Sequence, residues 1–373
     1  MPARHTPAAA AAAPGAAAAP WRQHTAFKRG FGRAVSRRSI GRRMPTTASA
    51  NASEDVPRPD QPLAATNPPL EVERQSERAL AYAAIAGLLG ASGVALAVAP
   101  SRAVQFLWGA CPSLLVAGLA RTLGSTLLLA AVCANCLKEA SEKDLLRSDT
   151  YKRLNLGLMW WGVATAGALW LAPAPPLRYA LGAWTALLAA TSAHAALTYQ
   201  ETSEKGEGLN PIFLVHQFLS SLGNLTSYAN GPDTALYALY AYGLAAKAAV
   251  AAMVAILIHG QLKLAQDGVL MAPLGTLGES LLPALGGGYV LAAVVLFTLK
   301  DAASRGRLGA STFKDLNIGV SIVTITHVIT FASWLQAGIL AQSKLVYAKV
   351  GAHALIAAFA MYNYAFAKKK KGH

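Results

Sequence analysis

Residues 119–157 read LARTLGSTLLLAAVCANCLKEASEKDLLRSDTYKRLNLG, and residues 281–319 read LLPALGGGYVLAAVVLFTLKDAASRGRLGASTFKDLNIG. The second stretch lies 162 positions after the first, and the two align without a gap. Sixteen of the 39 aligned residues are identical, which is more than a chain rich in Ala and Leu gives by chance. Each copy runs from one apolar segment through a charged loop into the next. The sequence therefore predicts a duplicated unit.

The balance of apolar and charged residues indicates a lipid environment. Hydrophobic residues make up 54% of the chain and charged residues 14%, and the apolar residues are gathered into runs. A soluble domain mixes charge into its surface, so we expect the lipid bilayer to surround this protein. A helix needs about 20 apolar residues to cross a bilayer. Eight segments meet this requirement: 79–99, 114–137, 154–172, 177–199, 235–259, 277–299, 316–340 and 345–367. The predicted fold class is an all-α integral membrane protein with eight transmembrane helices.

The eight segments divide into two groups of four. The first segment also resembles the fifth, at an offset of 156. An even number of crossings per copy gives both copies the same orientation, so we expect two parallel four-helix repeats related by an axis along the membrane normal. The predicted repeats cover 79–200 and 235–367. Between them, we expect the connector 201–234 to contain an amphipathic helix that lies on the membrane surface.

Residues 1–53 have the composition of an organelle transit peptide. They are rich in Ala, with nine basic residues and no acidic one, and they lack the apolar core of a secretory signal. We expect a disordered leader that directs the protein to the chloroplast. The mitochondrion is the alternative, because Phe27, Phe31 and Val35 recur every four residues between arginines, as on an amphipathic helix. The following residues 54–78 are polar and rich in Pro, which predicts an extended tether.

Basic residues predict the orientation of the helices. Eight crossings place both termini on one side of the membrane. After the leader, seventeen Lys and Arg in loops and tails fall on the side of the termini and four on the other side. The positive-inside rule then places both termini in the stroma, with the helices in the thylakoid or inner envelope membrane, or in the mitochondrial inner membrane as the alternative. The basic tail 368–373 fits this orientation. The formal charge of +15 comes from the leader and these flanks, so we expect no nucleic-acid partner.

Small residues occupy matching places in the second and sixth segments. Residues 124–126 are Gly-Ser-Thr, and the aligned residues 286–288 are Gly-Gly-Gly. Hydrophobic helices interrupted at matching places in two repeats often mark a substrate site, because a broken helix exposes backbone dipoles at mid-membrane. The alternative is close packing of small residues between helices.

Ionisable residues within the predicted helices extend this candidate path. A central Lys or Arg costs about 2.5–3.5 kcal/mol to insert, so such residues usually face a cavity or a partner. Glu279 lies one turn from the repeat equivalent of Arg121, and we hypothesise that the two form a pair; snorkelling of both side chains is the alternative. The predicted substrate path comprises Arg121, Gly124, Ser125, Thr126, Lys247, Glu279, Gly286, Gly287, Gly288 and His327.

Two function classes remain open. His327, with other histidines, could ligate a metal or a tetrapyrrole, but no paired ligand spacing is present and a hydrogen-bonded core histidine is the alternative. We therefore expect no metal, no cofactor and, without a recognisable catalytic motif, no enzyme. The first hypothesis is a chloroplast multi-pass membrane protein that transports a small solute or ion, or forms a channel for it, at a site between the two repeats. The alternative is a non-catalytic membrane subunit or assembly factor of a chloroplast membrane complex, with other membrane subunits as partners.

Overall fold

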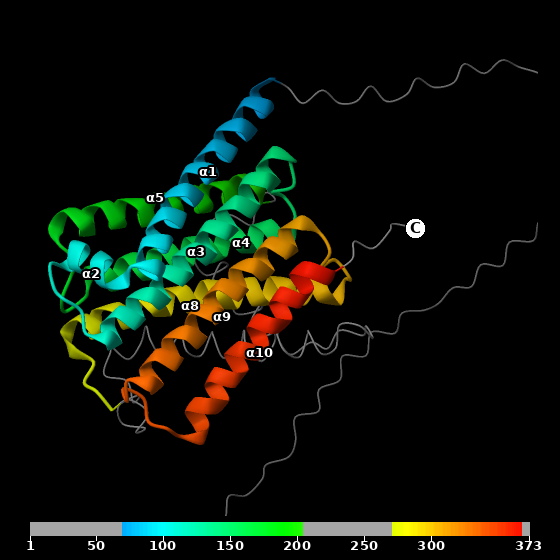
Figure 1. Ribbon diagram of the computed structural model, residues 1–373. Helices are drawn as coiled ribbons and strands as arrows, with labels where there is room; N and C mark the ends of the chain where they lie inside the picture. Colours follow the sequence, from blue (N-terminus) through cyan, green and yellow to red (C-terminus); the bar gives the residue numbers. More distant parts are fainter. Residues whose placement is uncertain (1–68, 204–270, 368–373) are drawn as a thin grey trace, which may run out of the picture. The chain divides into compact units, whose positions relative to one another are not determined.

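A computed structural model describes residues 69–203 and 271–367. The predicted leader, the predicted span 235–259 and the basic tail lie outside these residues, as do most of the predicted tether and connector. Every described element is an α-helix, and the described residues form no strand. The helices, labelled in Figure 1, are α1 (Pro69–Val98), α2 (Pro100–Trp108), α3 (Leu114–Glu142), α4 (Asp149–Trp170), α5 (Arg178–Thr202), α8 (Gly275–Ser304), α9 (Ser311–Gln336) and α10 (Lys344–Phe366).

Six of the described helices are long and apolar enough to cross a membrane, namely α1, α3, α5, α8, α9 and α10. Each coincides with a predicted span, so the all-α and multi-pass parts of the prediction are confirmed. The predicted span 154–172 falls in α4, which is not among the six. Polar residues in the first half of α4, including Lys152, Arg153 and Asn155, lower its hydropathy. The count of eight spans therefore stays a prediction.

Two helix boundaries differ from the prediction. The helix α1 begins at Pro69, so the last part of the predicted tether 54–78 is helical rather than extended. Proline suits the first turn of a helix, because the backbone N–H that it lacks would have no partner there. The short helix α2 was not predicted. It also has a proline in its first turn, Pro100, and it ends where Gly109 adopts a left-handed conformation with φ of 69°, which glycine adopts without strain.

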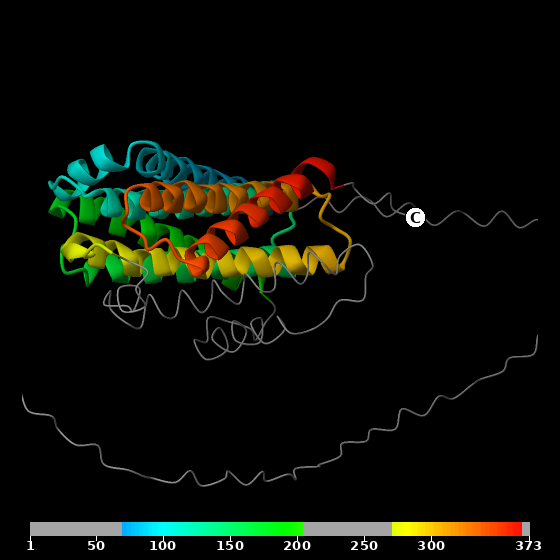
Figure 2. The same cartoon turned by 60° about the horizontal axis from the view of Figure 1, so that its bottom comes forward.

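The helices α3 and α8 form the centre of the bundle. The apolar stretch of α3 is 78% buried and that of α8 is 72% buried, against 28% for α1, 28% for α5 and 22% for α10. The helix α3 packs against α1, α8 and α9, while α4 packs against α5 and α8, as the two views in Figures 1 and 2 show. The peripheral helices expose apolar side chains such as Leu80, Leu197 and Leu355. These faces are suited to contact with lipid.

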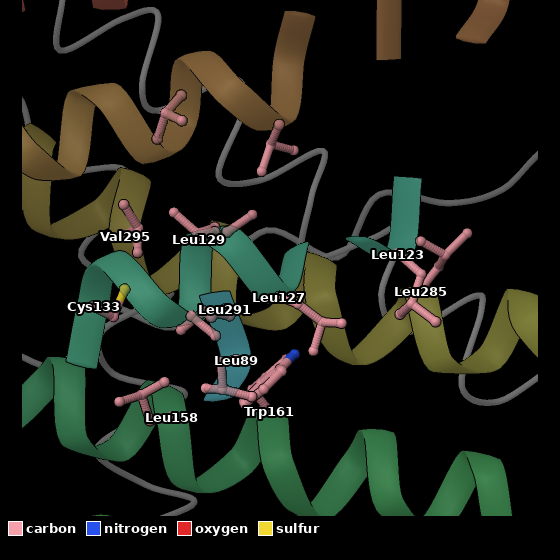
Figure 3. Close-up of a cluster of buried hydrophobic side chains, with 14 of the residues drawn as sticks. Leu89, Leu123, Leu127, Leu129, Cys133, Leu158, Trp161, Leu285, Leu291 and Val295 are labelled. Carbon is pink, nitrogen blue, oxygen red and sulfur yellow. The ribbon is translucent and has the colours of Figure 1, made fainter. Parts of the chain in front are cut away.

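The buried core joins side chains from both halves of the chain. Figure 3 shows Leu89 of α1, Leu127 of α3, Trp161 of α4 and Leu291 of α8 in one cluster. Leu89 and Trp161 are both 0% exposed. Segments more than a hundred residues apart in sequence therefore share one apolar core, and neither half of the described chain buries its apolar surface alone.

Glycines allow the helix backbones to approach closely. A Cβ atom on Gly124 of α3 would lie 2.7 Å from the carbonyl oxygen of Gly93 and 2.7 Å from the backbone nitrogen of Ala97, both in α1. Real Cβ atoms do not occupy such positions, so a larger residue would push α1 and α3 apart. Small residues that bring helix backbones together are a common means of association in membranes, where apolar burial from water gives no driving force.

Replacing Gly124 with Ala should destabilise the protein. The added methyl group meets backbone atoms that cannot rotate away, and overpacking of this kind costs about 1–3 kcal/mol. The matched control is Gly87→Ala in α1, because a Cβ there has no atom within 4 Å and Ala favours helix. Thermal unfolding of the purified protein in detergent should show a lower midpoint for Gly124→Ala and an unchanged or higher one for Gly87→Ala. Equal midpoints for the two variants would contradict the close approach of α1 and α3.

Candidate functional site

The small residues of the predicted substrate path lie inside unbroken helices. Both α3 and α8 are continuous through residues 124–126 and 286–288, so the helix interruption expected there is absent. Pro283 also lies inside α8 without ending it. The hydroxyls of Ser125 and Thr126 donate to the carbonyls of Thr122 and Leu123, at 2.7 and 2.8 Å. These hydroxyls therefore bind carbonyls of their own helix. Because α3 and α8 are unbroken at these residues, the exposed backbone dipoles expected there are absent as well.

The same small residues are contact points between helices. A Cβ on Gly288 of α8 would lie 2.6 Å from the Cβ of Thr126 in α3. A Cβ on the neighbouring Gly287 would lie 3.2 Å from the backbone nitrogen of Thr165 in α4. Gly286 is buried as well. Close packing, the alternative considered from the sequence, therefore accounts for these positions.

The charged members of the predicted path do not form the hypothesised pair. Arg121 of α3 and Glu279 of α8 are both half-buried, and the ion pairs of the described residues do not include one between them. Glu279 lies one turn from the residue of α8 that aligns with Arg121 of α3. The alignment therefore relates their positions along two helices, and such a relation does not require the side chains to touch. Lys247 lies outside the described residues.

His327 has hydrogen-bond partners at both ring nitrogens. Its Nδ1 lies 2.7 Å from the carbonyl oxygen of Val323, and its Nε2 lies 3.0 Å from the hydroxyl of Tyr289. This arrangement assigns the proton to Nδ1 and makes Nε2 the acceptor of the tyrosine hydroxyl. The ring stacks on His353 of α10, with 5.0 Å between the centroids. The described residues contain no group of three or more His, Cys, Asp or Glu that could hold a metal ion.

A second polar cluster, which the sequence did not single out as a site, joins α1, α4 and α5. The hydroxyl of Tyr82 donates to Oδ1 of Asn155 at 2.5 Å. The ring of Tyr82 meets the ring of His194 edge-on, with 4.5 Å between the centroids. We call Tyr82, Asn155 and His194 the polar triad. Polar residues within the predicted spans were the available signal, but nothing in the sequence shows that three separate helices bring these side chains together.

Buried polar atoms without a partner are concentrated in α4. Among the described residues, eight buried side-chain nitrogen or oxygen atoms lack a hydrogen bond, and four of them belong to this helix. They are Nδ2 of Asn155, Nε1 of Trp160, Nε1 of Trp161 and Oγ1 of Thr165. Figure 3 shows Trp161 with its ring nitrogen among apolar side chains of the core. Such atoms are costly in a water-poor interior, and they indicate a place where water or a ligand supplies the missing partner.

Ion pairs tie helix ends together on the side predicted to be stromal. Arg78 of α1 binds Glu201 of α5 at 2.5 Å, and Arg153 of α4 binds Asp301 of α8 at 3.0 Å. The guanidinium of Arg153 also lies over the ring of Phe297, 4.9 Å from its centroid. A cation between a carboxylate and an aromatic face is held in one orientation.

The residues aligned with Arg153 and Asp301 are Asp315 and Glu139, two acidic residues. The negative charges of Asp315 and Glu139 interact, and Lys143 compensates by binding Glu139 at 3.1 Å. This hydrogen bond raises the pKa of Lys143 above its ordinary value. Equivalent positions in the two halves therefore carry different chemistry, a cation–anion pair in one and an acidic pair in the other.

Comparison with known proteins adds no functional assignment. No known protein family matches the chain, and no curated protein matches it either. The functional argument therefore rests on the unpartnered polar groups of α4 and α5 and on the helices that position them.

Replacing Thr165 with Val should stabilise the folded protein or leave its stability unchanged. The change keeps the shape of the side chain and removes a buried hydroxyl that has no partner among the described residues. The folded state then avoids the free-energy cost of removing this hydroxyl from water. The matched control is Thr191→Val in α5, whose hydroxyl donates to the carbonyl of Leu187 at 2.8 Å. The control should lose about 0.5–1.5 kcal/mol. Denaturation of both variants in detergent measures the difference, and a larger loss at Thr165 would show that its hydroxyl has a partner.

Proposed function

We propose that the protein is a chloroplast membrane transporter or channel for a small polar solute or ion. The observation that carries the proposal is the set of unpartnered polar atoms in α4, which holds four of the eight such atoms among the described residues. Polar groups inside a membrane are expensive and are usually retained for a substrate or for structural pairing. Pairing within the described residues does not account for these atoms, because none of those residues offers them a hydrogen bond.

The helix α4 lies at the contact between the two proposed repeats. Trp161 and Thr165 lie one turn apart on this helix, and both approach Gly287 of α8: a Cβ there would lie 3.2 Å from the backbone nitrogen of Thr165 and 3.4 Å from the carbonyl oxygen of Trp161. The path proposed from the sequence ran between α3 and α8. Because the hydroxyls of Ser125 and Thr126 bind their own helix, we propose the path beside α4, where buried polar atoms lack a partner among the described residues.

Contacts between the halves support the tandem-repeat architecture. The helix α3 packs on α9 and α4 packs on α8, which is the exchange expected if a twofold axis relates two copies. Gly157 of α4 packs on Val294 of α8, and Gly319 of α9 packs on Val132 of α3. The second pair of residues follows from the first by the shift of 162 positions. A second copy in the same orientation is therefore the arrangement that we propose.

One ion pair supports four crossings in the first repeat. Arg78 lies in the first half of α1, directly before the predicted span 79–99, and Glu201 lies near the end of α5. If α1, α3, α4 and α5 cross the membrane in turn, the beginning of α1 and the end of α5 lie on the same side, as this contact requires. The same alternation makes α4 the third crossing. With the transit-peptide composition of residues 1–53, this leads us to propose a chloroplast membrane with both termini in the stroma.

The alternative function, a non-catalytic membrane subunit or assembly factor, is favoured by a different observation. The interface between α3 and α8 is tightly packed, with Gly288 against Thr126, and both helices are continuous. A rigid core of this kind suits a protein that packs against other membrane subunits. Co-purification with a large membrane complex in the absence of solute flux would favour this alternative.

Solute flux into proteoliposomes tests the transport proposal. Vesicles containing the full-length protein are exposed to gradients of glycerol, urea or potassium chloride, and light scattering records the recovery of vesicle volume. Wild type should accelerate recovery for at least one solute over empty vesicles. The double variant Trp161→Phe with Thr165→Val should slow it about tenfold, equivalent to ~1.4 kcal/mol in barrier height.

The control variant is Thr191→Val, whose hydroxyl binds its own helix, and its flux should equal that of wild type. Unfolding midpoints of the double variant and of wild type establish that a lost flux is not a lost fold. Recovery equal to that of empty vesicles with all three solutes would reject transport of these solute classes. Equal flux in wild type and the double variant would reject α4 as the path.

A further inference from the structure

The polar triad brings together three side chains from three helices. Asn155 is 0% exposed and Tyr82 is 1% exposed, while His194 is half-buried. The hydroxyl of Tyr82 is occupied by Asn155, and its ring contacts His194. Tyr82 therefore fixes the positions of the other two side chains relative to each other.

Two atoms of the triad have no partner among the described residues, and their hydrogen-bonding roles are complementary. Nδ2 of Asn155 and Nε2 of His194 are both buried without a hydrogen bond. The amide nitrogen of Asn155 is a donor. The ring of His194 makes a hydrogen bond to the backbone of Arg78. Because Nε2 is the ring nitrogen without a partner among the described residues, this bond belongs to Nδ1, and Nε2 of the neutral ring is left as an acceptor. A donor and an acceptor are thus available beside one tyrosine.

The aligned asparagine in the second half shows that an asparagine at this position can satisfy its amide nitrogen within its own helix. Asn317 is also 0% exposed, and its Nδ2 donates to the carbonyl of Phe313 in its own helix at 2.8 Å. The equivalent local acceptor for Asn155 would be the carbonyl of Tyr151. Asn155 instead accepts from Tyr82, and no described residue bonds its amide nitrogen. The arrangement in the first half keeps a donor available that the second half uses locally.

The charges next to the triad cancel. Arg78 lies one turn before Tyr82 on α1, and it binds Glu201 at 2.5 Å. One positive and one negative side chain in contact leave no net charge to attract an ion to this place. A neutral ligand is therefore favoured over an anion or a cation.

We propose that the polar triad binds a small neutral molecule through a hydroxyl group, beneath the ion pair of Arg78 and Glu201. A hydroxyl accepts a hydrogen bond from Nδ2 of Asn155 and donates its own hydrogen to Nε2 of His194, so one group satisfies both atoms. In this proposal the ligand enters past Arg78, which lies one turn before Tyr82 on α1, and the ion pair of Arg78 with Glu201 separates to admit it. This site deepens the proposed transport function, on which it rests, and names neutral hydroxylated compounds as the substrate class.

Chemical modification of His194 tests the site in the full-length protein. Diethyl pyrocarbonate acylates an unprotonated imidazole nitrogen, and peptide mass spectrometry measures the rate at each histidine. Glycerol is the probe ligand and should slow the modification of His194 at least threefold. His327 is the internal control, because both of its nitrogens have partners, and glycerol should not change its rate. In Asn155→Leu, His194 should remain reactive and lose the protection by glycerol.

The same assay also tests the role of the ion pair and the preference for an uncharged ligand. Glu201→Gln should raise the rate at His194 about tenfold, while Glu142→Gln, which removes an exposed partner of Lys138 on α3, should not. Potassium acetate should protect less than glycerol, and equal protection would overturn the assignment to a neutral ligand. If neither glycerol nor ethylene glycol protects His194 in wild type, only water occupies the triad and the proposal is wrong.

The modification assay separates this site from the transport function. It measures binding in detergent and needs no flux. Protection by glycerol without flux would retain the site and reject transport. Flux without protection would retain transport and overturn the site.

Discussion

The bundle depends on how closely the backbones of its helices can approach α3 and α8. In a bilayer, helices gain little from removing apolar surface from water, so dispersion contacts between well-fitting surfaces have to hold them together. Gly124 brings α3 against α1, and Gly288 brings α8 against Thr126 of α3. The peripheral helices, with their exposed apolar faces, are arranged around this centre. Any side chain that separates the central helices also separates the polar groups that they position.

Close packing at the centre explains where polar chemistry can and cannot occur. In α3, the hydroxyls of Thr122, Ser125 and Thr126 each donate to a carbonyl of their own helix, so their donors need no hydrogen bond from a ligand. In α4, the side chains of Trp161 and Thr165 are also buried, but no described residue supplies their polar atoms with a hydrogen bond. Asn155 of α4 and His194 of α5 also carry buried atoms without a partner among the described residues, where these helices meet α1. The hydroxyls of α3 are thus satisfied by their own helix, whereas α4 carries buried polar atoms without a partner among the described residues, and a solute would find partners there.

Much of the helical architecture could be predicted from hydropathy, because apolar runs of about 20 residues have few other uses. The glycine run at 286–288 was harder to interpret. A run of small residues can break a helix or let it pack closely, and only the neighbouring helices decide which. The polar triad lay beyond sequence reasoning for a related reason. Tyr82, Asn155 and His194 are unremarkable singly, and their orphaned atoms become apparent only when the partners available to each are known.

Paired cysteines at the contacts between the halves test the tandem arrangement most directly. In a chain whose native cysteines are replaced by Ala, one variant carries Gly157→Cys with Val294→Cys and another carries Val132→Cys with Gly319→Cys. The Cβ atoms would lie 3.2 and 3.5 Å apart, the first just below and the second at the lower limit of the range of about 3.5–4.5 Å in disulfides. Mild oxidation should cross-link both pairs, and Gly157→Cys with Val132→Cys should not react. A cross-link in only one pair, or in neither, would contradict two copies packed about a common axis.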